Sequence, residues 1–156
     1  MIKFVRIDHR LLHGQVLFSW TKSQNIARII VIDDEAATDD LKKMTMKLSK
    51  PADIKLSVFT IEQARERITK INGVSENTMV IFGNVATAAA ITPLLSDVKA
   101  VNYGGIPKRP DTQKFSNFIF LTAPEVEQSR ALKEAGLDLY MQQVPTSHRE
   151  SLTALL

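Results

Sequence analysis

Residues 29–32 read Ile-Ile-Val-Ile and residues 79–82 read Met-Val-Ile-Phe, and these two unbroken apolar runs decide the fold class. A short apolar run is typical of a strand that is covered on both faces, as the strands of parallel sheets are. A segment with apolar residues at helical spacing follows each run. This alternation predicts a parallel sheet that is covered by helices.

The same alternation of apolar runs and helical-period segments recurs along the whole chain. Further strands are expected at residues 2–7, 54–59, 98–103, 117–121 and 137–144, and helices at residues 15–24, 39–49, 60–71, 85–95 and 125–135. Right-handed crossovers place helices on both sides of a parallel sheet. Residues 1–156 are therefore predicted to form a single α/β domain with an open, mainly parallel β-sheet and helices on both faces.

Three local patterns refine this prediction. Thr60 and Gln63 have the spacing of a capping box at the start of a helix. In the helix expected at 39–49, apolar residues recur at helical spacing, and Met44 and Met46 are expected to pack in or near the core. The stretch 104–116 is the least regular part of the chain and is expected to be a loop.

Composition excludes several classes of function. The 156 residues contain 20 Lys and Arg, 17 Asp and Glu and no Cys, with a formal net charge of +3. The lack of Cys excludes disulfides, thiolate metal sites and a cysteine nucleophile. A small surplus of positive charge without a basic stripe argues against nucleic acid as a partner. No apolar run approaches the roughly 18–20 residues that span a bilayer, so no direct membrane insertion is expected.

The richest chemistry follows the first expected strand, where residues 6–16 read Arg-Ile-Asp-His-Arg-Leu-Leu-His-Gly-Gln-Val. Functional residues of such folds lie beyond the carboxyl ends of the strands. His13 and Gly14 come directly before an expected helix, whose free N–H groups favour a phosphate. Arg10 offers a planar fork of donors, and Asp8 is placed to orient a neighbour. A neutral imidazole can accept a phosphoryl group, although a simple polar turn also fits the residues.

Other candidate sites are weaker. His9 and His13 have i,i+4 spacing, but they lie in a loop without the metalloprotease pattern, so no metal site is expected. Asp33 and Asp34 come at the end of an expected strand. Some proteins have, at this position, an acidic pocket that accepts a phosphoryl group. A turn with charge at a helix start is the favoured interpretation of this pair.

The later part of the chain holds a glycine pair and a basic pair. Gly104 and Gly105 match no nucleotide-binding pattern, and they indicate a sharp turn or a close backbone approach. Lys108 and Arg109 have the charge to meet a phosphate or an acidic partner, although a solvated loop is favoured. His148 lies near the tail and is interpreted as incidental.

At residues 6–16 the sequence resembles the IIB component of the mannose/fructose/sorbose family of the bacterial phosphoenolpyruvate-dependent sugar phosphotransferase system. Every characteristic position of the family pattern, Arg-Ile-Asp-x-Arg followed by two apolar residues and His-Gly-Gln, is matched. Further agreement lies at residues 33–34, 39–40, 47–51, 102–105 and 142–145. Two positions depart from the family: His9 replaces a common Asp, and Tyr103 replaces a small or aliphatic residue.

The resemblance implies a phosphohistidine relay, a protein-phosphohistidine–sugar phosphotransferase without cofactor or metal. His13 would be phosphorylated on Nδ1. Arg10 and the backbone N–H groups near Gly14 and Gln15 would hold the phosphoryl oxygens, and Asp8 would orient its neighbours. Arg6, Gly104 and Gly105 are assigned to the outer part of the site.

The resemblance also implies partners and a location. A IIA component would donate the phosphoryl group, and a sugar bound in the membrane IIC/IID complex would receive it. The chain would act as a stand-alone IIB in the cytoplasm, associated peripherally with the permease. The alternative is a non-enzymatic, flavodoxin-like receiver module with an aspartyl-phosphate switch at Asp33 or Asp34.

Overall fold

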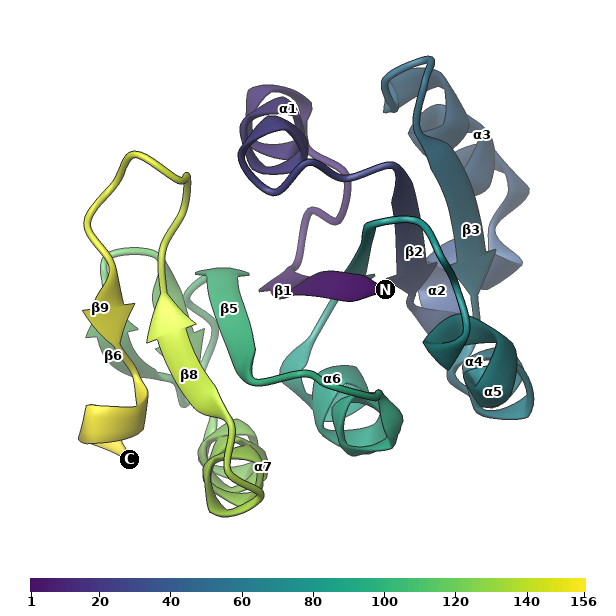
Figure 1. Ribbon diagram of the computed structural model, residues 1–156. Coiled ribbons are helices and arrows are strands. Elements are labelled where there is room, and N and C mark those ends of the chain that lie inside the picture. The colour runs from purple at the N-terminus through teal and green to yellow at the C-terminus, as the bar shows by residue number, and fades with distance from the viewer.

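The computed structural model describes residues 1–156 and contains a seven-stranded sheet (Figure 1). The strands in chain order are β1 (Ile2–Asp8), β2 (Arg28–Ile32), β3 (Lys55–Phe59), β4 (Thr78–Phe82), β5 (Ala100–Gly105), β8 (Asp138–Met141) and β9 (Glu150–Ser151). Their order across the sheet is β3-β2-β4-β1-β5-β8-β9, and every neighbouring pair is parallel except β8 and β9. The predicted open, mainly parallel sheet is confirmed.

Helices cover both faces of this sheet (Figure 1). They are α1 (Gly14–Ser23), α2 (Asp34–Thr38), α3 (Asp40–Ser49), α4 (Ile61–Glu66), α5 (Ile68–Asn72), α6 (Val85–Ile91) and α7 (Ala123–Glu134), with 3₁₀ turns η1 (Thr92–Leu94) and η2 (Thr153–Leu155). None of these helices has the length and apolar character needed to cross a bilayer. Buried side chains form two clusters. One contains residues of α1, α2 and α3, and the other contains residues of α4 to α7.

The alternation of side chains along β2 explains why its sequence is apolar throughout. Ile30 and Ile32 belong to the larger cluster, whereas Ile29 and Val31 belong to the smaller one. Successive side chains of a strand point to opposite faces, and both faces of this strand are covered. All four side chains are at most 2% exposed.

Several element boundaries differ from the sequence-based prediction. The Thr60 capping box is present, but the helix expected at 60–71 is divided into α4 and α5 at Arg67, whose backbone lies outside the helical region at φ −101° and ψ 12°. The helix expected at 85–95 ends at Ile91, because Pro93 lacks the N–H that a helix interior needs.

The region 104–116, expected to be an irregular loop, contains one strand of a small hairpin, and the strand expected at 117–121 supplies the other. β6 (Gln113–Ser116) pairs antiparallel with β7 (Ile119–Leu121) and forms a separate two-stranded sheet. Sequence periodicity missed β6 because its first two residues are exposed and polar. Gly104 and Gly105 lie inside β5, so the prediction that this strand ends at residue 103 is wrong.

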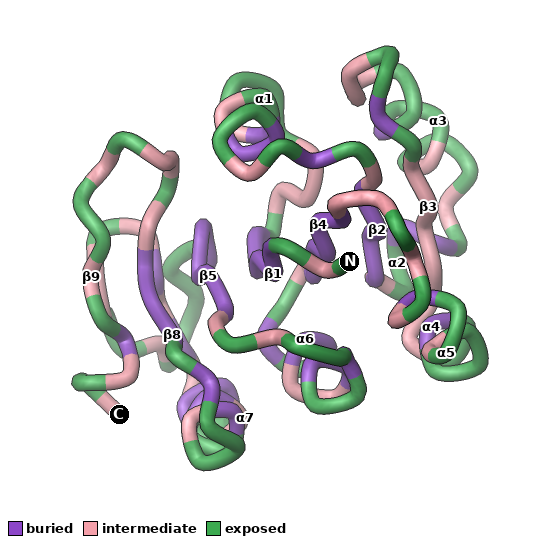
Figure 2. Tube along the Cα trace, viewed as in Figure 1, coloured by how far each residue is buried: buried purple, intermediate pink, exposed green.

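The core packing expected of Met44 is also wrong. Met46 is 7% exposed, whereas Leu41, Met44 and Leu48 on the same helix are 74%, 60% and 81% exposed. Most of α3 is correspondingly exposed or intermediate in Figure 2. The helix leads into β3, which is the edge strand of the sheet.

A matched pair of alanine substitutions on α3 tests this orientation. Met46→Ala should lower the free energy of unfolding by about 2–5 kcal/mol, because it leaves a cavity in the core. Leu48→Ala should change it by no more than about 0.5 kcal/mol, because the side chain is already in water. Urea denaturation of both variants measures the difference, and equal losses would contradict the orientation of α3.

Candidate active site

The candidate site lies in the loop between β1 and α1, at the carboxyl edge of the sheet. β1 lies between β4 and β5, so its end is flanked by the ends of two parallel strands. The N–H of His9 donates to the carbonyl of Gly105 at 2.9 Å, which fixes the start of the loop against β5. Leu11 has a φ of +58°, and the N–H of this residue donates to the carbonyl of Asp8 at 3.0 Å, so the chain turns sharply before the helix.

His13 occupies the N-cap position of α1, with an extended backbone at φ −128° and ψ 96°. Its side chain is exposed and does not cap the helix, and the first turn contains no acidic residue. The first N–H groups of a helix have no partner within the helix, and they carry the positive end of its dipole. The imidazole therefore lies at a helix end that attracts an anion. No capping side chain and no acidic residue of the first turn neutralises the positive charge of this helix end.

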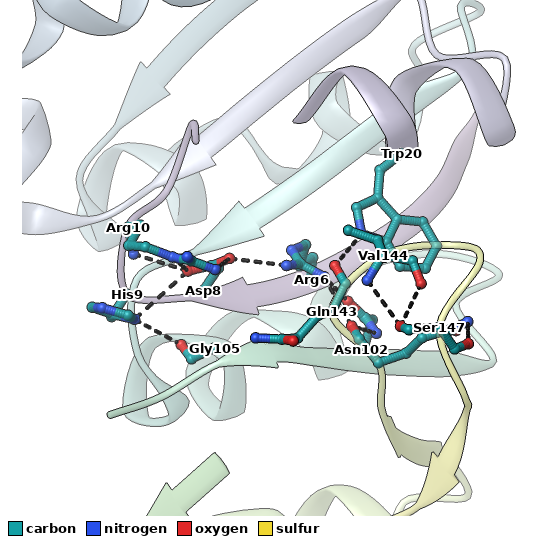
Figure 3. Close-up of polar contacts among 11 residues, drawn as sticks. Arg6, Asp8, His9, Arg10, Trp20, Asn102, Gly105, Gln143, Val144 and Ser147 are labelled. Carbon is teal, nitrogen blue, oxygen red and sulfur yellow. Dashed lines mark hydrogen bonds and ion pairs between the residues drawn. The ribbon is translucent and has the colours of Figure 1, made fainter. Parts of the chain in front are cut away.

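Behind this loop, the buried carboxylate of Asp8 lies between two arginines (Figure 3). Its Oδ2 accepts from Arg6 Nη2 at 2.9 Å, and its Oδ1 accepts from the backbone N–H of Arg10 at 3.0 Å and from Nε of the same residue at 3.2 Å. Arg6 and Asp8 are 2% and 0% exposed, whereas the Arg10 side chain is 32% exposed. The carboxylate thus holds the half-exposed guanidinium of Arg10 in a fixed orientation.

The charges of this cluster set its ionisation. Burial alone would raise the pKa of the Asp8 carboxyl group, but the charge of Arg6 and the hydrogen bonds from Arg10 outweigh it and hold the pKa below its usual value. Burial lowers the pKa of Arg6, and the carboxylate of Asp8 opposes that effect. Two guanidinium groups against one carboxylate leave net positive charge next to the loop.

Arg6 joins three segments that are far apart in the sequence. Its Nη1 donates to Asn102 Oδ1 at 2.5 Å and to the carbonyl of Gln142 at 3.2 Å. The guanidinium lies close to Gly104, where an added Cβ atom would be 2.0 Å from Arg6 Cζ. A side chain at position 104 would displace the buried arginine, which gives the physical reason for glycine there.

Trp20 connects α1 to the same network. Its indole N–H donates to the carbonyl of Gln143 at 2.9 Å, and the guanidinium carbon of Arg6 lies 5.6 Å from its ring centroid. The supporting roles of Trp20, Asn102 and Gln142 were not inferred from the sequence. The only signal in the sequence for these roles is the agreement of residues 102–105 and 142–145 with the family pattern. That agreement does not show that the two segments meet, because their contact forms only in the folded chain.

The acidic pair after β2 has structural partners. Asp33 caps α2, with its carboxylate accepting from the N–H of Ala36 at 2.9 Å. The carboxylate of Asp34 accepts from the N–H of Ile61 at 2.8 Å. The favoured interpretation of a turn with helix-start charge is confirmed for Asp33, and the pair helps to fix the neighbouring loops.

The remaining candidates lie around the edge of the site. Arg109 forms an ion pair with Glu125 at 2.7 Å, which secures the loop against the start of α7. Lys108 is exposed. The Nδ1 of His9 lies 3.1 Å from the carbonyl of Gly105, so this nitrogen carries a proton when the two atoms bond. No group of three or more His, Asp or Glu side chains is placed to hold a metal ion.

Tyr103, which departs from the family pattern, has a structural role. Its hydroxyl group lies 2.7 Å from Ser129 Oγ, and both side chains are buried. Burial raises the pKa of the Tyr103 hydroxyl group. The residue therefore connects β5 to α7 beneath the sheet and does not reach the loop that carries His13.

Comparisons with known proteins agree along the whole chain. A family model described as the PTS system sorbose subfamily IIB component matches residues 2–156. A probable phosphotransferase enzyme IIB component of Streptococcus pyogenes is 28% identical over 162 residues, which cover 100% of this chain and 99% of that protein. The crystal structure of manxB from Thermoanaerobacter tengcongensis has a TM-score of 0.89 and 32% identity, and it covers 99% of this chain and 94% of its own.

A third relative is longer. The PTS system mannose-specific EIIAB component of Escherichia coli is 27% identical over 156 residues. The match covers 100% of this chain and 48% of that protein, so this chain corresponds to about half of the relative.

The depressed pKa of Asp8 predicts an acid-sensitive contribution to stability. The ion pairs stabilise the fold above the ordinary carboxyl pKa of about 3.9, and this stabilisation is lost as the pH falls through the lowered value. Asp8→Asn should lower the free energy of unfolding at neutral pH by about 3–5 kcal/mol, since it leaves Arg6 buried without its counter-charge. It should also lose less stability on acidification than the parent protein.

Urea denaturation at pH values from about 7 down to about 2 measures both effects. Asp53→Asn is the matched control, because Asp53 is exposed and forms no ion pair. An identical acid profile for the parent protein and Asp8→Asn would show that the carboxylate does not act in this way.

Proposed function

Because the chain belongs to the sorbose-subfamily IIB components of the bacterial sugar phosphotransferase system, we propose that His13 is the residue that carries the phosphoryl group. IIB components are phosphotransferases that pass phosphate toward a sugar, so the chain is a phosphotransferase of this system. The observation that carries the assignment of His13 is its position. It is an exposed imidazole at the uncapped N-terminus of α1, in the same β1–α1 loop as Arg10, whose guanidinium Asp8 anchors.

The proposed step is a direct exchange between two imidazole groups. A neutral nitrogen of His13 attacks the phosphorus atom of a phosphohistidine on the donor protein. The new N–P bond forms as the donor N–P bond breaks, and the electrons of the broken bond remain on the donor imidazole. Transfer to the sugar then replaces the N–P bond on His13 by an O–P bond, and the proton of the sugar hydroxyl group leaves.

The surroundings of His13 support such a transfer by position and charge. A transferring phosphoryl group spreads negative charge over its equatorial oxygens, so fixed donors stabilise it. The backbone N–H groups of Gly14 and Gln15 lie in the first turn of α1, and the Arg10 guanidinium is held by Asp8. Nη1 of Arg10 has no protein partner, so this guanidinium keeps donors for a phosphoryl oxygen.

We infer the partners from the same relay. A IIA component donates the phosphoryl group, and a sugar in a membrane IIC/IID complex accepts it. The Escherichia coli relative, whose name combines A and B components, supports a IIA donor. Because the sugar is held by the permease, this relay places the chain at the cytoplasmic side of the membrane during transfer.

The receiver alternative gains no support. Asp33 is occupied as a helix cap, and Asp34 accepts a backbone N–H from the start of α4. The family comparisons point to IIB components. The relatives are named for mannose, fructose and sorbose, so the substrate is proposed at the level of a sugar.

Loss of the nucleophile should abolish labelling. Incubated with phosphoenolpyruvate and the upstream proteins, His13→Gln should receive no acid-labile, base-stable phosphate, because the attacking nitrogen is gone. His148→Gln is the matched control, since His148 is exposed in the tail, and it should be labelled stoichiometrically. Stoichiometric labelling of His13→Gln would refute the assignment.

Removal of the Arg10 fork should slow transfer without unfolding the protein. Arg10→Ala should lower the rate of phosphoryl transfer by more than about tenfold, since one electrostatic stabiliser commonly accounts for about 10²–10³ in rate. Rapid-quench measurement of transfer from a phosphorylated donor gives the rate. Arg65→Ala, which removes an exposed arginine from α4, should transfer at the parental rate. An unchanged rate for Arg10→Ala would remove the phosphate-binding role.

A further inference from the structure

One helix presents an apolar face to solvent. Leu41, Met44 and Leu48 of α3 are 74%, 60% and 81% exposed, and their i, i+3, i+7 spacing places them on one face, here named the α3 stripe. The other large apolar residues that are exposed lie on separate elements: Met1, Phe18, Leu94 and Leu155. Single exposed apolar residues are ordinary, whereas a contiguous group marks a contact surface.

The α3 stripe continues into a groove that reaches the active-site loop. The groove has a volume of about 340 Å³. The loop residues 9–12 line one side of it, and Leu41, Lys42 and Thr45 of α3 line the other. Because Leu41 belongs to both the stripe and the groove, the two form one surface that begins on α3 and ends beside Arg10.

The charges around this surface are mainly positive. Lys42, Lys43 and Lys47 lie on α3, and Arg10 lies across the groove. Three acidic residues lie near them. Glu35 pairs with Lys42, the carboxylate of Asp39 accepts from backbone N–H groups at the start of the helix, and Asp40 is exposed in the first turn. Lys43, Lys47 and Arg10 therefore outnumber the one acidic side chain, Asp40, that has neither a lysine partner nor a capping role. An apolar centre with a basic rim fits a partner that has an apolar centre and an acidic rim.

We propose that the α3 stripe and its groove form the docking face for the phosphoryl donor, a protein that presents apolar side chains and acidic residues around its phosphohistidine. The proposal rests on the phosphohistidine relay at His13. A donor seated on this face lies next to the loop that it must reach, and its phosphoryl group adds negative charge on the side of Arg10. A protrusion of the donor fills the groove, and the stripe packs against its apolar centre.

The charge of this face favours the donor over the permease. Cytoplasmic loops of membrane proteins carry an excess of Lys and Arg, so they would repel a lysine-bearing surface. A second copy of the chain would bring the same lysines against each other in a two-fold interface. A lipid surface would leave the groove unfilled, because a bilayer has no protruding side chain to enter it.

Such a face also suits a relay. A carrier must release each partner, so its interfaces are small and transient. Three apolar side chains provide a limited buried centre, and the basic rim accelerates encounter with an acidic surface without holding it permanently.

The test is the double variant Met44→Glu/Leu48→Glu. Both positions are exposed, so the fold should persist, which urea denaturation checks. The KM of the double variant for phosphorylated IIA should rise at least about tenfold, because charged side chains replace the apolar centre of the face. The kcat at saturating donor should stay within about twofold, because His13 and Arg10 are unchanged. The control Leu94→Glu/Leu155→Glu, on η1 and η2, should show parental kinetics.

Raised KM with unchanged kcat and full labelling at saturation supports the docking face. Parental donor kinetics in the double variant overturn it. If the double variant has parental donor kinetics, three further measurements identify another occupant of the face. Impaired transfer to permease vesicles would indicate the permease, and loss of a dimer seen by sedimentation would indicate a second copy. Loss of binding to anionic vesicles would indicate a lipid surface. Failure of the parent protein to accept phosphate would overturn the relay itself. Labelling of the parent protein is therefore measured first, so that failure of the relay is distinguished from failure of the docking proposal.

Discussion

The site depends on one buried carboxylate that two arginines neutralise. Asp8 is fully buried, and a lone charge in that position would be strongly destabilising. Arg6 meets it from the interior and Arg10 meets it from the loop. Because the carboxylate cannot move without losing both partners, the first turn after β1 is held in place on its buried side, although its outer surface is in water.

This arrangement separates rigidity from accessibility. In the proposed relay two different proteins reach His13, which requires an exposed position, whereas phosphoryl transfer requires donors held in place. The buried side of the network meets the second requirement through Asn102 and Gln142, which both bond to Arg6. The imidazole itself contributes to neither the core nor a cap, so it remains free for chemistry.

The fold and the loop were predictable from the sequence for different reasons. The apolar run at 29–32 requires cover on both faces, and its alternation with segments of helical period predicts a layered α/β sheet. The polar loop at 6–16 stands out because His, Arg and Gly precede a helix start. Strand order and the contact of Arg6 with Asn102 and Gln142 were not predictable, because they are long-range pairings that no local pattern encodes.

The misassigned face of α3 shows the limit of helical periodicity. The i, i+3, i+7 pattern identifies which side chains share a face, but it does not identify what that face packs against. In α4 to α7 the partner is the sheet, and the pattern indicates the core. In α3 the single buried Met46 faces inward, while three large apolar side chains face water. An apolar face that the domain leaves uncovered is best explained by a partner, and its continuity with the groove beside Arg10 puts that partner next to the loop proposed to carry the phosphoryl group.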